Sequence, residues 1–237
     1  MGAKLRTYRN NIGSSFFTRK DLRDRELARL LLSLLCSKEE FRPAAFQIGQ
    51  RWIPIASDFG LVTDHWMATS SINLRNSSEY KAQLTLTMSW SASGKYNTSL
   101  FWVEQEYFTD QERIERYLEL QIGLYALLEA SYGYIHQTQD AIEMSTYRHP
   151  IHGRTVRAID LPNGLPGVFW ANFFGPEYVA KVTRAKLLAA LCYKVQELFD
   201  GGVMILISPS PIGPNLEPNR VAQARLRNYL GNQVVRP

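Results

Sequence analysis

The chain has 237 residues, of which 45% are hydrophobic, and this is enough for one sizeable core. Its formal net charge of +5 raises the question of nucleic acid, but the charges are unevenly distributed. Basic residues are in excess by six in residues 1–51 and by six in residues 148–237, whereas acidic residues are in excess by seven in residues 52–147. This pattern disfavours nucleic acid as a partner and indicates an acidic surface for a basic partner.

The cysteine content and the N-terminus bear on the cellular compartment. Cys36 and Cys192 lie far apart in leucine-rich segments, so we expect reduced, buried thiols and no disulfide framework. The N-terminal residues carry charges where a secretory signal needs an apolar run, and no stretch approaches the roughly 18 apolar residues of a membrane span. We therefore expect a soluble cytoplasmic protein that forms one domain over residues 1–237.

The first predicted element is a helix that begins near Thr18, where Thr18 to Asp21 resembles a capped start. Five leucines then share one helical stripe, at positions 27, 30, 31, 34 and 35. Residues 45–57 are apolar but are broken by Gly49 and Pro54, which predicts a strand or an irregular edge.

Residues 82–90 alternate apolar and polar side chains, so they predict a strand with one buried face. A loose turn at residues 91–95 leads into a second strand with two possible registers. The more apolar face of this strand holds Phe101, Val103, Gln105 and Tyr107. Trp102, Glu104 and Glu106 are therefore expected to point outward.

A capping box at Thr109 to Glu112 predicts the start of a long helix with a buried face that includes Ile114, Tyr117 and Leu124. Its opposite face carries Glu112, Glu115, Arg116 and Glu119. These charges are typical of a solvated helix face, with acids near the N-terminus, and a partner-binding role is the alternative.

The last third predicts a buried strand at residues 167–175, a helix start at Pro176, and a leucine-rich helix over residues 184–199 that ends at Gly201 and Gly202. A buried strand at residues 203–207, a Pro-rich loop near 208–218 and a basic C-terminal helix near 219–230 follow. Together the elements predict an α+β fold with an antiparallel-rich sheet packed against several helices.

A search for catalytic patterns gives little. The sequence has no G-x-S-x-G elbow and no glycine-rich phosphate loop, and both cysteines lie in apolar segments. Of the four histidines, His65, His136, His149 and His152, only the last two are close in sequence. With a proline between them and no cysteine nearby, they favour a solvated loop over a zinc site. We expect no metal and no cofactor.

One short pattern supports a rival function. Asp64, Glu79 and Lys81 have the spacing with which restriction-type nucleases hold a divalent metal and position a water. The pattern is common by chance, and Glu79 and Lys81 also fit the polar end of a solvated strand. A nucleic-acid-binding or metal-dependent nuclease domain therefore remains the alternative to a binding protein.

Residues 164–179, GLPGVFWANFFGPEYV, with the leucine-rich segment after them, resemble the most recognisable part of the immunity protein 52 family, in particular its TsiT-type members. The resemblance implies a non-enzymatic immunity protein whose partner is a type VI secretion effector with a restriction-endonuclease-like toxin domain. The positions that match the family pattern are expected to be structural first: Trp170, Asn172, Phe174, Gly175 and Tyr178.

An immunity protein of this kind acts by stoichiometric binding, and an acidic surface would oppose the cationic groups that a nuclease exposes for phosphate. The expected partner-binding residues combine one aromatic anchor with a charged rim. They are Trp102, Glu104, Glu106, Glu112, Glu115 and Glu119. The sequence leaves open whether such a protein occludes the toxin's active site or blocks toxin assembly, and it leaves the oligomeric state open.

Overall fold

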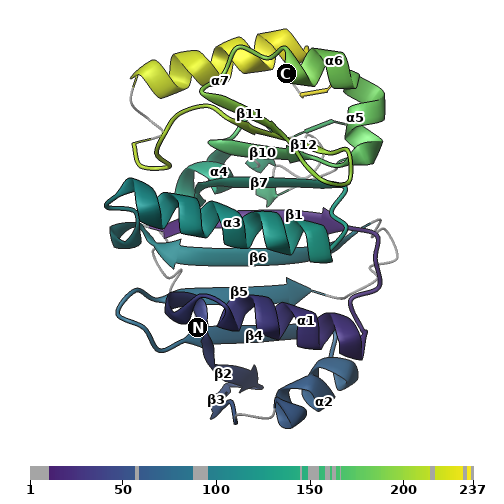
Figure 1. Cartoon of the computed structure of the whole chain (residues 1–237), viewed down its shortest axis with the longest axis vertical. Coiled ribbons are helices and arrows are strands. Elements are labelled where there is room, and N and C mark those ends of the chain that lie inside the picture. The colour runs from purple at the N-terminus through teal and green to yellow at the C-terminus, as the bar shows by residue number, and fades with distance from the viewer. Residues whose placement is uncertain are drawn as a thin grey trace.

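A computed structural model describes residues 11–56, 59–87, 96–144, 146–148, 155–157, 161, 164–165, 167–213, 217–231 and 234–235. Its centre is a ten-stranded sheet in the order β11-β12-β10-β7-β1-β6-β5-β4-β2-β3, in which every neighbouring pair is antiparallel (Figure 1). Helices cover this sheet, so the predicted α+β class with an antiparallel-rich sheet is confirmed.

The elements of the large sheet lie in the following bounds. The strands are β1 (Asn11–Thr18), β2 (Pro43–Ile48), β3 (Arg51–Pro54), β4 (Ser71–Asn76), β5 (Ala82–Thr87), β6 (Asn97–Glu104), β7 (Tyr132–Gln137), β10 (Ala171–Phe174), β11 (Lys194–Glu197) and β12 (Val203–Leu206). A separate hairpin is formed by β8 (Thr146–Arg148) and β9 (Thr155–Arg157).

The helices are α1 (Arg25–Cys36), α2 (Gly60–Ala68), α3 (Gln111–Leu127), α4 (Thr138–Met144), α5 (Pro176–Val182), α6 (Arg184–Leu188) and α7 (Glu217–Leu230), with short 3-10 turns η1 (Glu39–Phe41) and η2 (Gln105–Tyr107). No helix in the described part of the chain is both long and apolar enough to cross a membrane.

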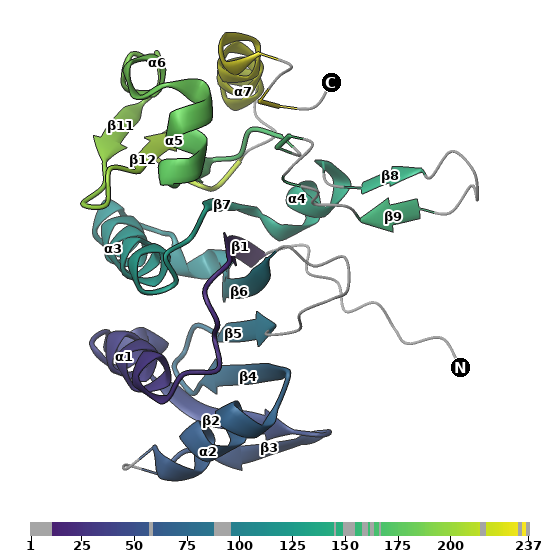
Figure 2. The same cartoon turned by 90° about the vertical axis from the view of Figure 1, so that its right-hand side faces the viewer.

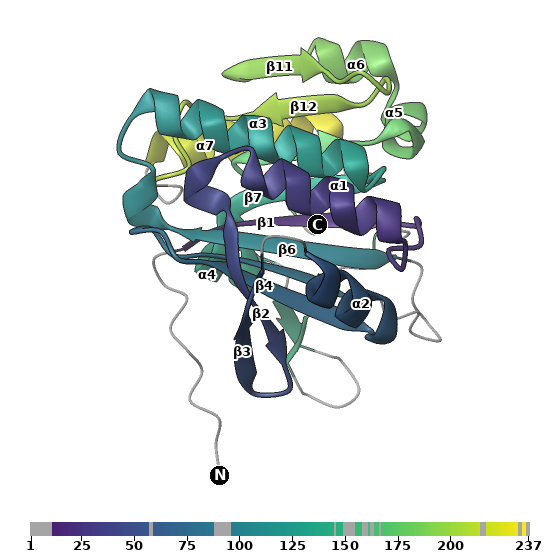
Figure 3. The ribbon, with the colours of Figure 1, turned by 60° about the horizontal axis from the view of Figure 1, so that its bottom comes forward.

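The helices α1, α2 and α3 all lie on one side of the sheet (Figure 2), and α1 and α3 run side by side (Figure 3). Buried aromatic rings join them to the strands, as where Tyr117 of α3 packs 6.0 Å from Phe101 of β6. On the other side, α4 contacts β1 and β7, and Phe169 stacks 4.0 Å from Tyr134 of β7. The strands β1, β7, β10 and β12 are therefore buried on both faces.

The start of α1 differs from the prediction. Thr18 is the last residue of β1, a strand that pairs with β6 and β7, and the helix begins only after Asp24. The Asp24 carboxylate accepts the Leu27 backbone N–H at 2.6 Å and is the true cap. A threonine next to charged residues looks the same at a strand end as at a helix start.

The start of α3 also differs from the prediction, by one residue. Asp110, not Thr109, is the N-cap, and its carboxylate accepts the Arg113 backbone N–H at 2.9 Å. This bond lowers the pKa of the Asp110 carboxyl below its usual value. The predicted buried face, with Ile114, Tyr117 and Leu124, is confirmed.

The predicted helix over residues 184–199 is wrong. The helix α6 ends at Leu188, and Lys194–Glu197 form the edge strand β11. Gly201, with φ +82, belongs to the tight turn between β11 and β12, where the Leu198 N–H donates to the Gly202 oxygen at 2.8 Å. Leu191 and Phe199, expected in a helical core, are 83% and 78% exposed.

Other local predictions are confirmed. Pro176 opens α5 behind the cap residue Gly175, and residues 203–206 form a fully buried strand. The helix predicted near 219–230 is α7, and residues 208–213 of the Pro-rich segment form an irregular connection before it. Cys36 and Cys192 differ from the prediction of buried thiols, since both are only partly buried and Cys192 lies outside any helix. Met88, Trp90 and the turn at residues 91–95 lie outside the described residues.

Candidate functional site

The five strands β2 to β6 form a half of the sheet in which many residues remain partly exposed, and in β4 and β6 burial alternates along the strand. In β6 the pattern is strictly alternate, with Phe101 and Val103 buried and Trp102 and Glu104 half-buried. The predicted register is therefore confirmed within β6, but Gln105 and Tyr107, which were expected in the same strand, lie in the 3-10 turn η2 because the strand ends at Glu104. The apolar face is covered by α1, α2 and α3, and we call the opposite face of β2 to β6 the open face (Figure 2).

Strand pairing places one residue of each strand in a continuous row on the open face. Ala45 lies opposite Pro54 and Arg75, Arg75 lies opposite Gln83, and Gln83 lies opposite Trp102. Because side chains alternate along a strand, these residues point to the same face while Phe46, Leu74, Leu84 and Phe101 point to the core. The row brings together residues that are distant in sequence.

A groove with a volume of about 730 Å³ lies along this row. Its walls include two indoles, two cationic side chains and several neutral polar groups; six of the lining residues are Trp52, Arg75, Ser78, Lys81, Gln83 and Trp102. None of the described residues that line it is acidic. The groove thus combines aromatic surface with positive charge, which are properties of protein-binding surfaces.

Two interactions organise the charges of the groove. The Arg75 guanidinium lies 4.4 Å from the centre of the Trp52 ring, which is within the range of a cation–π contact. Lys81 Nζ lies 3.3 Å from Glu104 Oε1, so the acidic residue expected at the partner surface is already paired with a cation. Among the described residues, no carboxylate forms an ion pair with Arg75.

The structure divides the six expected partner-binding residues between different layers. Trp102 and Glu104 lie on the open face, and Glu106 is exposed in η2 at the end of β6. The helix acids, Glu112, Glu115 and Glu119, lie on α3, which covers the opposite face. The six residues therefore do not form one acidic surface, because the 3-10 turn η2 after β6 carries the chain past the ends of the strands to the face that α3 covers.

The helix acids have local partners. Glu112 lies 3.7 Å from Arg116, Glu115 accepts a hydrogen bond from Gln111, and Glu119 lies 2.6 Å from Lys38 Nζ. This is the arrangement of a solvated helix face with spaced ion pairs. These contacts agree with the simpler of the two interpretations of the sequence.

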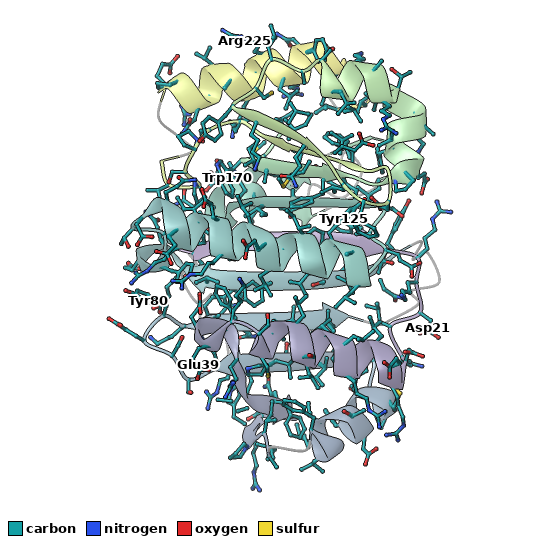
Figure 4. The ribbon with its side chains drawn as sticks, in the orientation of Figure 1. Asp21, Glu39, Tyr80, Tyr125, Trp170 and Arg225 are labelled. Atoms are coloured by element: carbon teal, nitrogen blue, oxygen red, sulfur yellow. The ribbon has the colours of Figure 1, made fainter. Side chains whose placement is uncertain are left out.

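The three residues of the nuclease-like pattern are not gathered into a site. Asp64 lies on α2 and pairs with Arg25 at 2.7 Å, whereas Lys81 pairs with Glu104. Glu79 is exposed in the turn beside Tyr80, which Figure 4 places at the side of the molecule opposite α2. In the described residues, no group of three His, Cys, Asp or Glu side chains is placed to hold a metal. His149 and His152 lie outside the described residues.

Of the family-pattern positions, Trp170 and Asn172 stabilise a buried turn that enters β10. Trp170 is 1% exposed, and its indole N–H donates to the Ser208 oxygen at 2.9 Å. The Asn172 side chain accepts the Phe169 N–H at 3.1 Å and donates to the Phe169 oxygen at 2.8 Å, so it replaces the backbone partners that this turn lacks.

Phe174, Gly175 and Tyr178 form the corner between β10 and α5. Phe174 is fully buried, and the Tyr178 hydroxyl donates to the Leu161 oxygen at 2.8 Å. Gly175 passes so close to the preceding loop that an added Cβ would lie 2.7 Å from the Ser131 carbonyl oxygen. Since φ at Gly175 is −70°, the requirement is for space and not for an unusual backbone conformation.

Sequence reasoning missed a pair formed by the buried His136 and Asp140 beside the turn that enters β10. His136 has no exposed side-chain surface; its Nδ1 accepts the Trp170 N–H at 3.1 Å and its Nε2 contacts the Asp140 carboxylate. With Nδ1 as acceptor, the ring proton belongs on Nε2. The bond to His136 lowers the pKa of Asp140 below its usual value. The spacing of four residues was the available signal, but it crosses from β7 into α4.

Sequence reasoning also missed Trp52 and Arg75 of the groove. Alternation within residues 45–54 and 71–76 gives their faces, but only the pairing of β2 with β3 and β4 shows that they meet. The open face therefore carries a groove whose described lining combines aromatic, cationic and neutral polar side chains from several strands.

Comparison with known proteins shows a likeness in structure. No protein-family model matches the chain, and no curated protein matches it. Among solved structures, the Pseudomonas aeruginosa T6SS protein PA0821 is similar, with a TM-score of 0.52 and 13% sequence identity over 92% of this chain and 74% of that one. At this identity the likeness concerns the fold.

Proposed function

We propose that this chain is a non-enzymatic immunity protein that binds and neutralises a cognate type VI secretion toxin in the cytoplasm. Two independent observations support the proposal. The segment at residues 164–179 resembles an immunity family, and the fold is similar to that of a protein named for the T6SS. The proposal includes the toxin class that the resemblance implies, a nuclease-type effector with a restriction-endonuclease-like domain.

The observation that carries the proposal is the groove on the open face. Tryptophan and arginine are among the residues that most often dominate the free energy of protein association, and here Trp52, Trp102 and Arg75 line one concave site. Trp102 is half-buried in the free protein, so part of its indole surface can still be removed from water by a partner. We propose this groove as the toxin-binding site.

Neutralisation of a toxin is the direct test. The reading frame next to the gene should encode the toxin, and co-expression of this chain should restore growth of bacteria that produce it. The two purified proteins should form a stoichiometric complex in size-exclusion chromatography. Absence of a complex together with unrestored growth would contradict the proposal.

The rival function has its own test. A metal-dependent nuclease would cleave DNA or RNA in the presence of Mg²⁺, whereas we expect no cleavage by the purified chain because Asp64 and Lys81 have separate ion-pair partners. Glu79→Ala is the control variant. Magnesium-dependent cleavage that this substitution abolishes would replace the binding function with the nuclease function.

A further inference from the structure

The groove on the open face carries a positive charge that no carboxylate among the described residues neutralises. Arg75 lies in its centre, on β4, and its neighbours in the cross-strand row are the neutral residues Ala45 and Gln83. No carboxylate forms an ion pair with Arg75 among the described residues, whereas Lys81, which lines the same groove, pairs with Glu104. A cation of this kind is available to a ligand.

The Trp52 ring orients this cation. The Arg75 guanidinium carbon lies 4.4 Å from the centre of the Trp52 ring, within the range of a cation–π contact, and its planar fork of N–H donors has no carboxylate partner among the described residues. Such a fork matches the two oxygens of one carboxylate, which can accept two parallel hydrogen bonds from it. Arg75 loses less side-chain entropy on binding than an unrestrained arginine would, because its contact with Trp52 already restricts it.

We propose that the groove recognises an acidic side chain in an extended segment of the partner protein, with Arg75 as the carboxylate-binding residue and Trp102 as the apolar wall beside it. The inference rests on the proposed function only for the identity of the partner. The inferred partner segment is acidic, whereas the charge distribution in the sequence suggested a basic partner.

The charges around the groove favour one carboxylate over a nucleic-acid backbone. A strand of nucleic acid places a phosphate at every nucleotide and binds to a track of several cations. Here Lys81 is neutralised by Glu104 at 3.3 Å, and Glu79 and Glu106 are exposed near the same end of the strands. One oriented guanidinium beside neutral polar groups suits a single acidic side chain flanked by apolar residues.

A metal-dependent nuclease offers such a target, because its metal is held by carboxylates. An arginine that pairs with one of them would occupy the position of the metal. Occlusion of a toxin's active site would then follow from a cationic groove, without any mimicry of DNA.

The test uses the full chain and two short fluorescent peptides that differ at one position. Both have a central tryptophan, with Glu beside it in one and Gln in the other, and binding is measured by fluorescence anisotropy at low salt. We expect the Glu peptide to bind at least about tenfold more tightly, since a charge-assisted bidentate pair is lost in the other. Higher salt should reduce this ratio.

Variants assign the preference to Arg75. Arg75→Gln should abolish the difference between the peptides, and Arg75→Lys should retain only part of it because the fork is lost. The matched control is Arg51→Gln on the adjacent hairpin, where pairing with Ile48 turns the side chain to the other face of the sheet. Arg51→Gln should leave the ratio unchanged. Circular dichroism checks that each variant is folded.

Three results would overturn the inference: equal affinities for the two peptides, no measurable binding of either peptide, or a preference that survives in Arg75→Gln. Single-stranded DNA of the same length is the rival probe. Tight binding of this DNA that Arg75→Gln removes would assign the groove to nucleic acid instead. Because the peptide ratio is measured without the toxin, its failure is distinct from a failure to neutralise the toxin.

Discussion

The two halves of the sheet differ in what covers them. In the covered half, β1, β7, β10 and β12, almost every residue is buried, because loops and helices pack on both faces. In the open half, β2 to β6, fewer residues are buried: β4 and β6 bury alternate residues, and β3 buries none. The covered half holds the family-pattern residues, and the open half holds the groove.

This difference explains why a recognisable sequence segment can mark the fold without marking the binding site. Residues 167–175 stand out because a buried turn, the four-residue strand β10 that is buried on both faces and the close-packed corner at Gly175 require large apolar residues and a glycine, although only residues 171–174 of the predicted strand are a strand. Such a segment marks the fold. A binding site on the open face consists of single residues from several strands, so it leaves no comparable signature.

The largest expected loss of stability follows from a substitution in the covered half. Trp170→Ala removes a fully packed indole and its hydrogen bond to Ser208, and we expect it to lower the free energy of unfolding by about 3–5 kcal/mol. Urea denaturation measures this loss. Trp170→Phe keeps most of the ring volume and should cost less. A loss below about 1 kcal/mol would show that the turn before β10 is not part of the cooperative core.

The next effect concerns the close approach at the corner of β10 and α5. Gly175→Ala should lower the free energy of unfolding by about 3 kcal/mol, because the new Cβ meets backbone carbonyls that cannot move aside. Gly49→Ala in the hairpin of the open half is the comparison. Its Cβ meets no described atom, so only backbone strain of about 1 kcal/mol is expected. Equal losses at both sites would remove the steric argument.

The pair of His136 and Asp140 in the covered half predicts that the stability of the protein depends on pH. Since the folded-state pKa of Asp140 is lowered, mainly by its bond to His136 and also by Arg220, its contribution to stability is present above its unfolded pKa and is lost as pH falls through the folded value. The stability difference between the wild type and Asp140→Asn should therefore shrink below about pH 4. Thermal unfolding at several pH values measures it, and a difference that grows on acidification would refute the assignment.

The smallest effect belongs to the open half. Lys81→Gln removes one partner of a pair whose lysine side chain is 76% exposed, so the free energy of unfolding should change by less than about 1 kcal/mol. Chemical denaturation gives the value. A much larger loss would mean that the open face contributes to the core, and the contrast between the two halves would fail.

Much of the fold could be predicted from local patterns. The alternation in residues 82–86 and 97–103 gave the faces of β5 and β6, and the buried run at residues 203–206 gave β12. The predictions failed where one sequence pattern fits both a helix and a strand. Leu187 and Val195 fit a helical stripe, but the turn at Gly201 pairs Val195 with Ile205 in an antiparallel hairpin.

The site was less predictable than the fold. The register of β6 identified Trp102 as a residue of the open face, but its groove partners Trp52 and Arg75 depend on the order β6-β5-β4-β2-β3, which no local pattern specifies. The count of acidic residues along the chain wrongly predicted one acidic surface, because it also ignores where the chain lies in the fold. The acids of residues 104–119 are adjacent in sequence, yet the chain passes from the open face to the covering helix within that segment.

The central claim is that the groove, and not the acidic helix, binds the toxin. Isothermal titration of the toxin with the wild type, Trp102→Ala and Glu115→Gln tests it directly. The account predicts that Trp102→Ala weakens binding by about 2 kcal/mol, roughly 30-fold, with little change in stability, and that Glu115→Gln leaves the affinity within about twofold. An unchanged affinity for Trp102→Ala, with a clear loss for Glu115→Gln, would contradict the account.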